Sequence, residues 1–457
     1  MKIEQAVTTR PEAIARLGEA VPRYTSYPTA PHFHPGVGTE TVRDWLEALA
    51  AGDEVSLYVH VPYCDRLCWF CACNTRITRR YEPVAAYLQS LLAEIATIAG
   101  AVGGKAKVRS VHFGGGSPTM LKPQDIVALD RSMRGAFDYL PDAEVSVEID
   151  PNDMDEARFD ALAAIGLSRV SLGVQDFDPK VQKAINRLQS FEQTRAVVEG
   201  TRARGVRSVN LDLLYGLPHQ TCESVAATME QALSLQPDRI ALFGYAHVPW
   251  FKKHQTMIDE AWLPDGAARL AQSQTAASLV QARGYQAVGL DHFAKPDDTL
   301  AVAARNGTLR RNFQGYTDDR CETLIGLGPS SISRFRQGYA QNAAATADYQ
   351  RRIGEKGMAT ARGIAFSDGD RLRSWVIERL MCDFAFSATE AVARFGNAAL
   401  PLLDEAAAYA VSDTDGLLER HGDDFVVGGD ARHLVRIVAA HFDSYLPRGG
   451  ARHSAAV

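Results

Sequence analysis

The chain has 457 residues, of which 46% are hydrophobic and 23% are charged, as expected for a folded protein with a large core. Its 49 basic and 55 acidic side chains give a formal net charge of −6, which argues against a protein that binds nucleic acid or an anionic membrane. The first twenty residues lack the continuous apolar segment of a secretory signal, and no later stretch approaches the length of a membrane span, so we expect a cytoplasmic protein.

The N-terminal residues predict an extended arm rather than a folded unit. Residues 21–35, "VPRYTSYPTAPHFHP", are rich in proline and aromatic side chains, and proline favours extended and turn conformations. We therefore expect residues 1–40 to form an arm that lies against a domain beginning near residue 41.

Between residues 55 and 245, short β-branched apolar runs alternate with Ala- and Leu-rich amphipathic stretches. The six runs cover residues 55–61, 107–113, 144–149, 169–174, 207–214 and 239–245. The helix candidates between them include residues 83–99, 123–137, 191–205 and 222–235. Such alternation implies parallel strands joined by right-handed crossovers. It predicts an α/β fold, a partial (β/α)6 TIM-like barrel.

The remaining third of the chain follows a different pattern. A seventh apolar run at 285–294 extends the predicted sheet, and we expect the Gly-rich stretch 311–333 to be a loop over the rim. Beyond about residue 350 helices dominate, with a hairpin-like segment at 416–429 before a final helix. We expect the barrel to cover 41–345 and a mainly helical, winged-helix-like domain to cover 346–457. That domain has no basic stripe, so it suits packing better than DNA binding.

Four of the seven cysteines lie in "VPYCDRLCWFCACN", residues 61–74, with the spacing C-x3-C-x2-C-x-C. Structural zinc usually takes two well-separated pairs of ligands, and the sequence offers no distant second pair. Thiolates this close suit a single iron–sulfur cluster, and three of them leave one iron open to a small molecule. The other cysteines are solitary in sequence and suit buried packing: Cys222, Cys321 and Cys382.

Glycine and polar residues accompany the other predicted strands. The stretch "GGGSPT" (114–119) follows the second, Glu148 lies in the third, Gln175 ends the fourth, Asp212 lies in the fifth and "AHVPW" (246–250) follows the sixth. Chemistry in such barrels sits where strands end, so we expect these residues to share one rim. A carboxylate in an apolar strand is costly without a partner. Each of the two acids is therefore expected to hold a ligand or a cation.

The cysteine motif, with Phe70 before its third cysteine, and the "GGGSP" after the next strand resemble the signature of radical S-adenosylmethionine enzymes. Eight motifs in register resemble the oxygen-independent coproporphyrinogen III oxidase family: "PRYTSYPT", "YVHVPYCDRLCWFCACN", "HFGGGSPT", "VEIDP", "SLGVQDF", "NLDLLYGLP", "DHFAKPDD" and "RNFQGYT". This resemblance implies an oxidoreductase of haem biosynthesis. It would convert two propionates of coproporphyrinogen III to vinyl groups, anaerobically, giving protoporphyrinogen IX.

The resemblance also implies cofactors and the residues that bind them. A 4Fe-4S cluster is implied at Cys64, Cys68 and Cys71. Two molecules of S-adenosylmethionine are implied per chain, the first at Tyr58, Gly115, Glu148 and Ile332. The second is implied at Phe70, Gly116, Ser117, Gln175, Arg187, Asp212 and Ala246. The implied catalytic residues are Tyr58, Glu148, Phe313 and Gln314.

Several of these side chains also suit plainer roles. Cys73 could be a spare thiol or a zinc-like ligand, Arg187 could form a surface salt bridge, and others could be ordinary core: Tyr58, Phe313, Gln314 and Ile332. Arg23 and Tyr24 lie in the arm, which the resemblance places over the mouth of the site. A basic residue there suits a substrate with four carboxylates.

The nearest alternative is a haem-chaperone paralogue, which binds haem without oxidase activity. The fourth cysteine, the "PRYTSYPT" arm and "RNFQGY" (311–316) favour the oxidase, and a zinc-stabilised structural module suits neither the spacing nor the barrel. The sequence carries no flavin or second-cluster motif, so we expect an external electron donor and an external electron acceptor. The resemblance favours a monomer.

Overall fold

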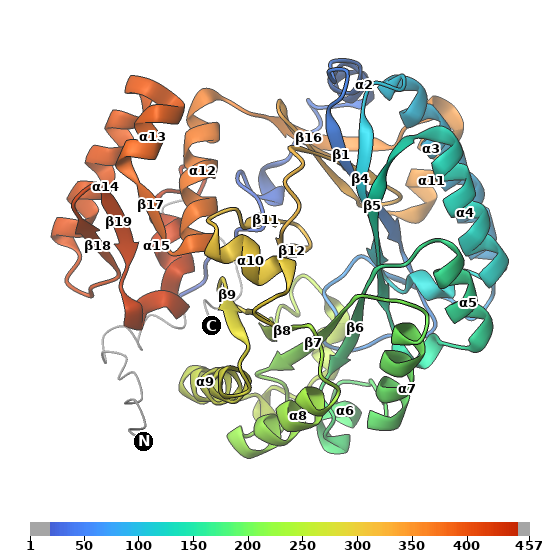
Figure 1. Cartoon of the computed structure of the whole chain (residues 1–457), viewed down its shortest axis with the longest axis horizontal. Coiled ribbons are helices and arrows are strands. Elements are labelled where there is room, and N and C mark those ends of the chain that lie inside the picture. The colour runs from blue at the N-terminus through green and yellow to red at the C-terminus, as the bar shows by residue number, and fades with distance from the viewer. Residues whose placement is uncertain (1–18, 447–457) are drawn as a thin grey trace.

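The structure, a computed structural model, describes residues 19–446 and is built around one 12-stranded mixed sheet that curves about a central cavity. Figure 1 shows helices covering the outer face of the curved sheet, with a second, smaller unit beside its open edge. The sheet order is β16-β15-β14-β13-β1-β4-β5-β6-β7-β8-β10-β9. The first 18 residues of the predicted arm lie outside the described residues.

The middle of the sheet consists of six parallel strands, as the alternating pattern predicts. They are β1 (Glu54–Val61), β4 (Lys107–Gly115), β5 (Asp138–Ile149), β6 (Arg169–Gln175), β7 (Ser208–Tyr215) and β8 (Arg239–Gly244). In β1, alternate residues from Val55 to Val61 are almost fully buried. The face turned to the helices is buried and apolar while the inward face carries polar residues, which is why apolar and polar residues alternate in strands such as β6.

The crossover helices pack on the outside of the sheet (Figure 1). They are α3 (Glu82–Val102), α4 (Pro123–Ala136), α5 (Glu156–Ala164), α6 (Pro179–Ala184), α7 (Phe191–Arg202), α8 (Cys222–Ser234) and α9 (Gly266–Ala282). Local sequence sets where they begin. In α7, Ser190 accepts a hydrogen bond from the backbone N–H of Gln193, whose side chain accepts one from the N–H of Ser190. Such a reciprocal cap satisfies two backbone donors at the helix start.

Among residues 19–446, α3 is the one helix long and apolar enough to cross a membrane by length and composition. The sequence-based expectation that no stretch reaches that length is therefore wrong. The apolar character has another physical source, since α3 packs between β13, α4 and α11 and buries Leu91 and Ile95 completely. Glu94 on the same buried face accepts hydrogen bonds from Gly328 N–H and Tyr349 O–H.

Both edges of the sheet extend beyond the six strands. On one side β13 (Thr323–Leu327) lies parallel to β1 and is followed by three antiparallel strands, β14 (Ile332–Phe335), β15 (Gly338–Asn342) and β16 (Thr360–Ala365). On the other side β10 (His292–Ala294) pairs with β8, and β9 (Gln286–Val288) pairs with β10. The latter confirms the predicted extension at 285–294.

The stretch 311–333 is not the loop that its glycines suggested. It contains most of the hairpin β11 (Arg310–Asn312) and β12 (Gly315–Thr317), all of β13 and the start of β14. Its segment "GPSSIS" (328–333) begins with a tight turn in which Gly328 and Ser330 both have positive φ values, 90° and 62°. The Gly-rich spacing marks turns between very short strands.

Short elements complete the barrel. They are α2 (Thr39–Glu47), β2 (Tyr63–Cys64), β3 (Arg76–Ile77), α10 (Thr299–Arg305) and α11 (Thr346–Lys356). The predicted barrel boundary at residue 345 stays a prediction, and the sheet itself continues to Ala365 in β16.

The C-terminal unit has its own apolar cluster. It comprises α12 (Asp368–Asp383), β17 (Ala385–Ser387), α13 (Ala388–Phe395), α14 (Leu400–Ser412), β18 (Leu418–His421), β19 (Asp424–Val427) and α15 (Val435–His441). The pair β18–β19 is the expected hairpin. Tyr24 and Tyr27 of the arm are buried in the same cluster, and their hydroxyls bond Asp443 (3.0 Å) and Ser444 (2.8 Å). The arm therefore joins the barrel to the C-terminal unit.

Candidate active site

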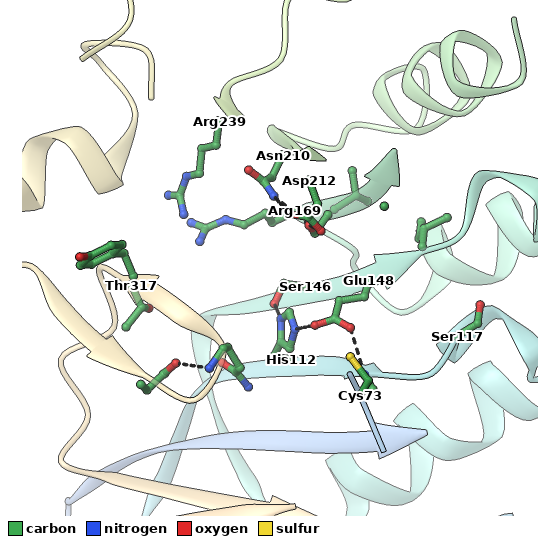
Figure 2. A pocket seen from close by; sticks show the side chains of 18 of the residues that line it. Cys73, His112, Ser117, Ser146, Glu148, Arg169, Asn210, Asp212, Arg239 and Thr317 are labelled. Atoms are coloured by element: carbon green, nitrogen blue, oxygen red, sulfur yellow. Dashed lines mark hydrogen bonds and ion pairs between the residues drawn. The ribbon is translucent and has the colours of Figure 1, made fainter. Parts of the chain in front are cut away.

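A cavity of about 870 Å³ lies inside the curved sheet. Its upper wall is the cysteine loop, residues 64–73, and its sides are the inward faces of β1 and of β4 to β8. The hairpin β11–β12 and the segment after it close the open side. Figure 2 shows His112 of β4, Glu148 of β5 and Asp212 of β7 with their side chains directed into this space. The predicted rim residues on the first five strands are thus brought to one cavity, whereas none of residues 246–250 lines it.

The cysteine loop presents its four thiols to the cavity. Cys64 lies in β2, while Cys68, Cys71 and Cys73 follow in irregular backbone, and all four line the cavity wall. A hydrogen bond from the Cys73 thiol lowers the pKa of Cys71 to about 7. Burial raises the pKa of Cys64. Cys73 is the most exposed of the four, so the structure brings it close to the predicted ligand trio while leaving its role open.

The three consecutive glycines at the end of β4, Gly114 to Gly116, pack too closely for any side chain. A Cβ on Gly114 would lie 2.7 Å from a carboxylate oxygen of Glu148, and one on Gly116 would lie 2.6 Å from the backbone oxygen of Tyr63. Gly115 has φ +113°, a region that favours glycine, and its N–H donates to Glu148 at 3.0 Å. These glycines let the backbone of one strand end approach both the acid and the cysteine loop.

Glu148, in β5, is held by two donors. Its Oε1 accepts from His112 Nε2 at 3.1 Å, and His112 in turn contacts Ser146 Oγ through Nδ1 at 2.7 Å (Figure 2). Burial by itself raises the pKa of Glu148, but the His112 and Gly115 hydrogen bonds hold it below the ordinary value. Tyr58 stacks on the His112 ring at 5.9 Å, although it does not itself line the cavity. Glu148 is therefore an ionised acid in a fixed position.

Asp212, in β7, is the second acid of the cavity. It accepts hydrogen bonds from Ser171 Oγ at 2.8 Å and Asn210 Nδ2 at 2.7 Å. Burial raises the pKa of Asp212 to about 6, and the nearby charge of Glu148 acts in the same direction. Both of its hydrogen-bond partners are neutral. We expected a ligand or a cation at this acid, and within the described residues Asp212 forms no ion pair with a protein cation. An incoming cation would suit it.

Arg187 is buried beneath the cysteine loop rather than on the surface. Its Nη1 lies 3.1 Å from Asp150 and 3.6 Å from the sulfur of Cys68. Its Nη2 donates to the carbonyl of Gly173. Gln175, which also lines the cavity, has a left-handed backbone with φ 70°. The surface salt bridge considered for Arg187 is thus a buried one, beside a predicted cluster ligand.

The remaining members of the predicted second S-adenosylmethionine site lie on the cavity wall or next to it. Phe70 and Ser117 line the cavity, and Ser117 Oγ donates to Asp153 at 2.7 Å. Ala246 is not a lining residue, but it lies beside Phe70. The side-chain amide of Gln255 donates to the carbonyl oxygens of both, at 3.2 and 2.9 Å.

Besides Tyr58 and Ala246, two more predicted residues lie outside the lining of the main cavity. Gln314 lines it, whereas Phe313 and Ile332 pack into a small apolar cluster with Tyr339. The Phe313 and Tyr339 rings meet edge to face at 5.6 Å. Phe313 also lines a smaller cavity of about 20 Å³ that shares wall residues with the large one. The structure therefore places this pair beside the site rather than in its lining.

The floor of the cavity carries a group of charges that the sequence analysis missed. Arg169 and Arg239 begin β6 and β8, and both reach Asp318, at 3.5 and 3.6 Å. Arg169 also pairs with Glu144 at 3.0 Å, and Arg239 with Asp298 at 2.7 Å. Figure 2 shows both guanidinium groups directed into the cavity. The available signal was an arginine opening each of two apolar runs, "RVSLGV" and "RIALFG".

The residues present fit a 4Fe-4S cluster and S-adenosylmethionine. Iron–sulfur clusters take cysteine thiolates, and the three predicted ligands share one wall of a cavity large enough for further ligands. The Arg187 guanidinium supplies positive charge beside Cys68, and its buried Nε has no hydrogen-bond partner among the described residues. A side chain at Gly115 would strike the His60 ring at 2.6 Å, so the backbone there is kept bare.

Fold and site together define a radical S-adenosylmethionine enzyme. The Radical SAM superfamily model matches residues 58–232, which span β1 to α8 and include the cysteine loop and the glycine rim. Coproporphyrinogen III oxidase from Escherichia coli, described as a radical SAM enzyme, superposes with a TM-score of 0.89. It is 37% identical in sequence, and the match covers 94% of this chain and 100% of that one.

Curated relatives agree with the structural match. The oxygen-independent coproporphyrinogen III oxidase of Bradyrhizobium diazoefficiens is 49% identical over 96% of this chain and 98% of its own length. That of Paracoccus denitrificans is 49% identical over 98% of both chains. The chain belongs to the oxygen-independent coproporphyrinogen III oxidase family. These names support the oxidase and give no support to the haem-chaperone alternative.

Proposed function

We propose that this enzyme carries out the oxygen-independent oxidative decarboxylation of two propionate side chains of coproporphyrinogen III, giving protoporphyrinogen IX. The observation that carries the proposal is the single cavity into which the cysteine loop, the glycine rim, Glu148 and Asp212 all open. Each propionate loses a hydrogen atom, carbon dioxide and one electron to become a vinyl group. The carbon–hydrogen bond is unactivated, so a side-chain base cannot remove the hydrogen as a proton and a cofactor must supply the chemistry.

When bound together, the cluster and S-adenosylmethionine supply a 5′-deoxyadenosyl radical that can take this hydrogen atom. The protein positions the groups. Cys64, Cys68 and Cys71 would hold the cluster through three irons, and the Arg187–Asp150 pair would orient the Cys68 side of the loop. With a thiolate on each of three irons, the fourth iron stays available to S-adenosylmethionine.

The acids and the bare backbone would bind two molecules of S-adenosylmethionine. We assign the first to Tyr58, Gly115, Glu148 and Ile332. Glu148 is the group that keeps its charge at neutral pH, because its pKa lies below the ordinary value, so it suits a cationic amino group. We assign the second to Phe70, Gly116, Ser117, Gln175, Arg187, Asp212 and Ala246. Asp212 accepts only neutral donors within the described chain and could receive the second amino group.

The substrate would enter from the side closed by the β11–β12 hairpin. Gln314 lies on that side of the cavity lining, with Phe313 next to it in the smaller adjoining cavity. We propose that Tyr58, Glu148, Phe313 and Gln314 act at the reacting end of the site. A monomer in the cytoplasm, supplied by an external electron donor and an external acceptor, would meet these requirements.

The test is an anaerobic assay on reconstituted enzyme with a chemical reductant, S-adenosylmethionine and coproporphyrinogen III, following the vinyl product. Reconstitution should give about four irons per chain. Separate alanine substitutions at Cys64, Cys68 and Cys71 should each abolish the assembled cluster, whereas Cys73→Ala should keep it. Cluster loss in Cys73→Ala alone would refute the ligand assignment, and tight haem binding without any vinyl product would refute the reaction.

A further inference from the structure

Three surface segments surround the cysteine loop and hold its backbone. They are residues 76–80, 183–188 and 250–257, together called the collar. Thr78 N–H donates to the carbonyl of Cys64 at 2.9 Å, and Asn186 Nδ2 donates to that of Leu67 at 2.8 Å. The sulfur atoms of this loop line the cavity. Apart from Arg187, which lines the cavity, the collar therefore contacts the same loop through its backbone from outside the cavity lining.

The third collar segment makes the closest contacts to the end of the loop. His254 Nε2 donates to the carbonyl of Cys71 at 2.7 Å, and Lys252 Nζ donates to that of Cys73 at 2.8 Å. A protein seated on the collar would thus be separated from the cysteine loop by one layer of side chains. It would not occupy the cavity.

The collar is basic in a chain that is acidic overall. Its surface cations are Arg76, Arg79, Arg80, Lys183, Lys252 and Lys253. The three segments contain no aspartate or glutamate, although the whole chain carries a net charge of −6. Within residues 19–446 none of these six cations forms an ion pair with the protein, whereas the buried Arg187 is already paired with Asp150. Unpaired charge of one sign on a surface attracts a partner of the opposite sign.

Acids that lie near the collar in the chain form no ion pair with its cations, and among them the exposed Glu82 forms none within the described residues. Asp65 is bound by its neighbour Arg66 at 2.7 Å. Glu260 pairs with His247 at 2.9 Å, and Asp259 accepts a hydrogen bond from the backbone N–H of Ala261. None of these acids forms an ion pair with a collar cation within the described residues.

Apolar side chains are gathered on the same surface. Five of the nine large apolar residues left exposed among residues 19–446 belong to the collar: Ile77, Leu188, Trp250, Phe251 and Met257. Phe251 is 72% exposed and Leu188 is 66% exposed. Exposed aromatic and aliphatic groups rimmed by charge are typical of protein interfaces. The combination favours a protein partner over a small ion.

We infer that the collar is the docking surface for an acidic one-electron carrier protein that reduces the cluster. The inference rests on the proposed function, which needs electrons from outside the chain. One electron leaves the carrier, which is oxidised by one equivalent, and the cluster is reduced by one equivalent. No atoms are transferred in this step. The carrier approaches the loop from the collar side, so electron entry and substrate binding use different faces of the cysteine loop.

The test compares two charge-reversal variants of the reconstituted enzyme with the same change in net charge. The collar variant is Arg79→Glu/Arg80→Glu/Lys253→Glu. The matched control is Arg131→Glu/Arg207→Glu/Lys356→Glu, at exposed cations outside the collar that form no ion pair within the described residues. The probe is a reduced, acidic [2Fe–2S] ferredoxin, and the readouts are its binding affinity and the cluster reduction followed by electron paramagnetic resonance.

The collar variant should bind the ferredoxin at least about tenfold more weakly at low salt, and its cluster should be reduced correspondingly more slowly. The difference should shrink as ionic strength rises. The control should stay within about twofold of the wild type. Reduction by dithionite should be equal in all three proteins, which shows that the cluster is intact. Phe251→Ser should weaken ferredoxin binding without changing its salt dependence, since it removes apolar contact only.

Several outcomes would overturn the inference. One is equal loss in the collar and control variants, and another is unchanged ferredoxin binding in the collar variant. Self-association of the enzyme through the collar, detected by sedimentation without ferredoxin, would assign the surface to a second copy instead. Failure of the proposed function would look different, because no vinyl product would form even with dithionite.

Discussion

Asp212 offers the sharpest test of how this cavity binds a cation. Its pKa of about 6 compares with an ordinary value of 3.8. The ionised fraction should then fall about tenfold between pH 7 and pH 5. If Asp212 binds the amino group of the second S-adenosylmethionine, affinity at that site should fall by the same factor, which equals ~1.4 kcal/mol. Asp212→Asn should bind more weakly at pH 7 and show no such dependence.

The measurement is isothermal titration of S-adenosylmethionine into reconstituted enzyme across pH 5 to 8. Asp153→Asn is the control, because burial and the charge of Asp150 also raise the pKa of Asp153 to about 6. The wild-type pH profile should persist in that control and vanish only in Asp212→Asn. A profile that survives in Asp212→Asn, or a flat profile in the wild type, would refute the assignment.

The same shift has a consequence for stability with a definite sign. The folded-state pKa of Asp212 lies above its unfolded value, so the folded protein binds the proton more tightly. The contribution of protonated Asp212 to the free energy of unfolding is therefore fully present below about pH 4, and it is lost as the pH rises through about 6. Asp212→Asn should raise the free energy of unfolding of the apoprotein at pH 8 by up to ~3 kcal/mol, as measured by urea denaturation. A less stable variant at pH 8 would contradict this.

Three further predictions follow from the same site. Arg187→Ala should destabilise the apoprotein by ~3–5 kcal/mol in denaturant unfolding, because it leaves Asp150 buried without its partner; a loss below ~1 kcal/mol would contradict the buried pair. Gly116→Ala should abolish S-adenosylmethionine binding in titrations, because its Cβ would meet the Tyr63 backbone at 2.6 Å, whereas Gly135→Ala meets nothing within 4 Å and should be harmless. Exposure to air should bleach the cluster absorbance and stop turnover; undiminished aerobic turnover would exclude radical chemistry.

The parallel core of the fold was predictable because its signal is local. Each of the six strands buries one face under the helices and turns the other towards the cavity. Each is followed by a helix whose periodicity is visible in one stretch of sequence. The other edge was not predictable in this way. β13 pairs with β1 across more than half of the chain, and its partner strands β14 and β15 are only four and five residues long. Such short runs carry little propensity, and pairing over that distance leaves no local trace.

The same contrast between local and long-range signals decides which parts of the site could be predicted from the sequence. Thiols that sit together in sequence, such as Cys64 to Cys71, could be expected from their spacing to share one wall, and strand ends could be expected to meet at one rim. The floor could not, since Asp318 reaches Arg169 and Arg239 only after the segment following β12 folds over the strand starts. Phe313 and Ile332 are placed by packing against Tyr339, and packing of that kind has no pattern in the sequence.

The arm sets an order on how the enzyme is assembled. Tyr24 and Tyr27 bond Asp443 and Ser444, which are among the last residues of the described chain. A ribosome makes the N-terminal end first, yet this end cannot reach its final position until residue 444 has emerged. Every strand of the barrel is complete long before that moment. The newly made barrel therefore waits with Tyr24 and Tyr27 undocked until the C-terminal unit has been made.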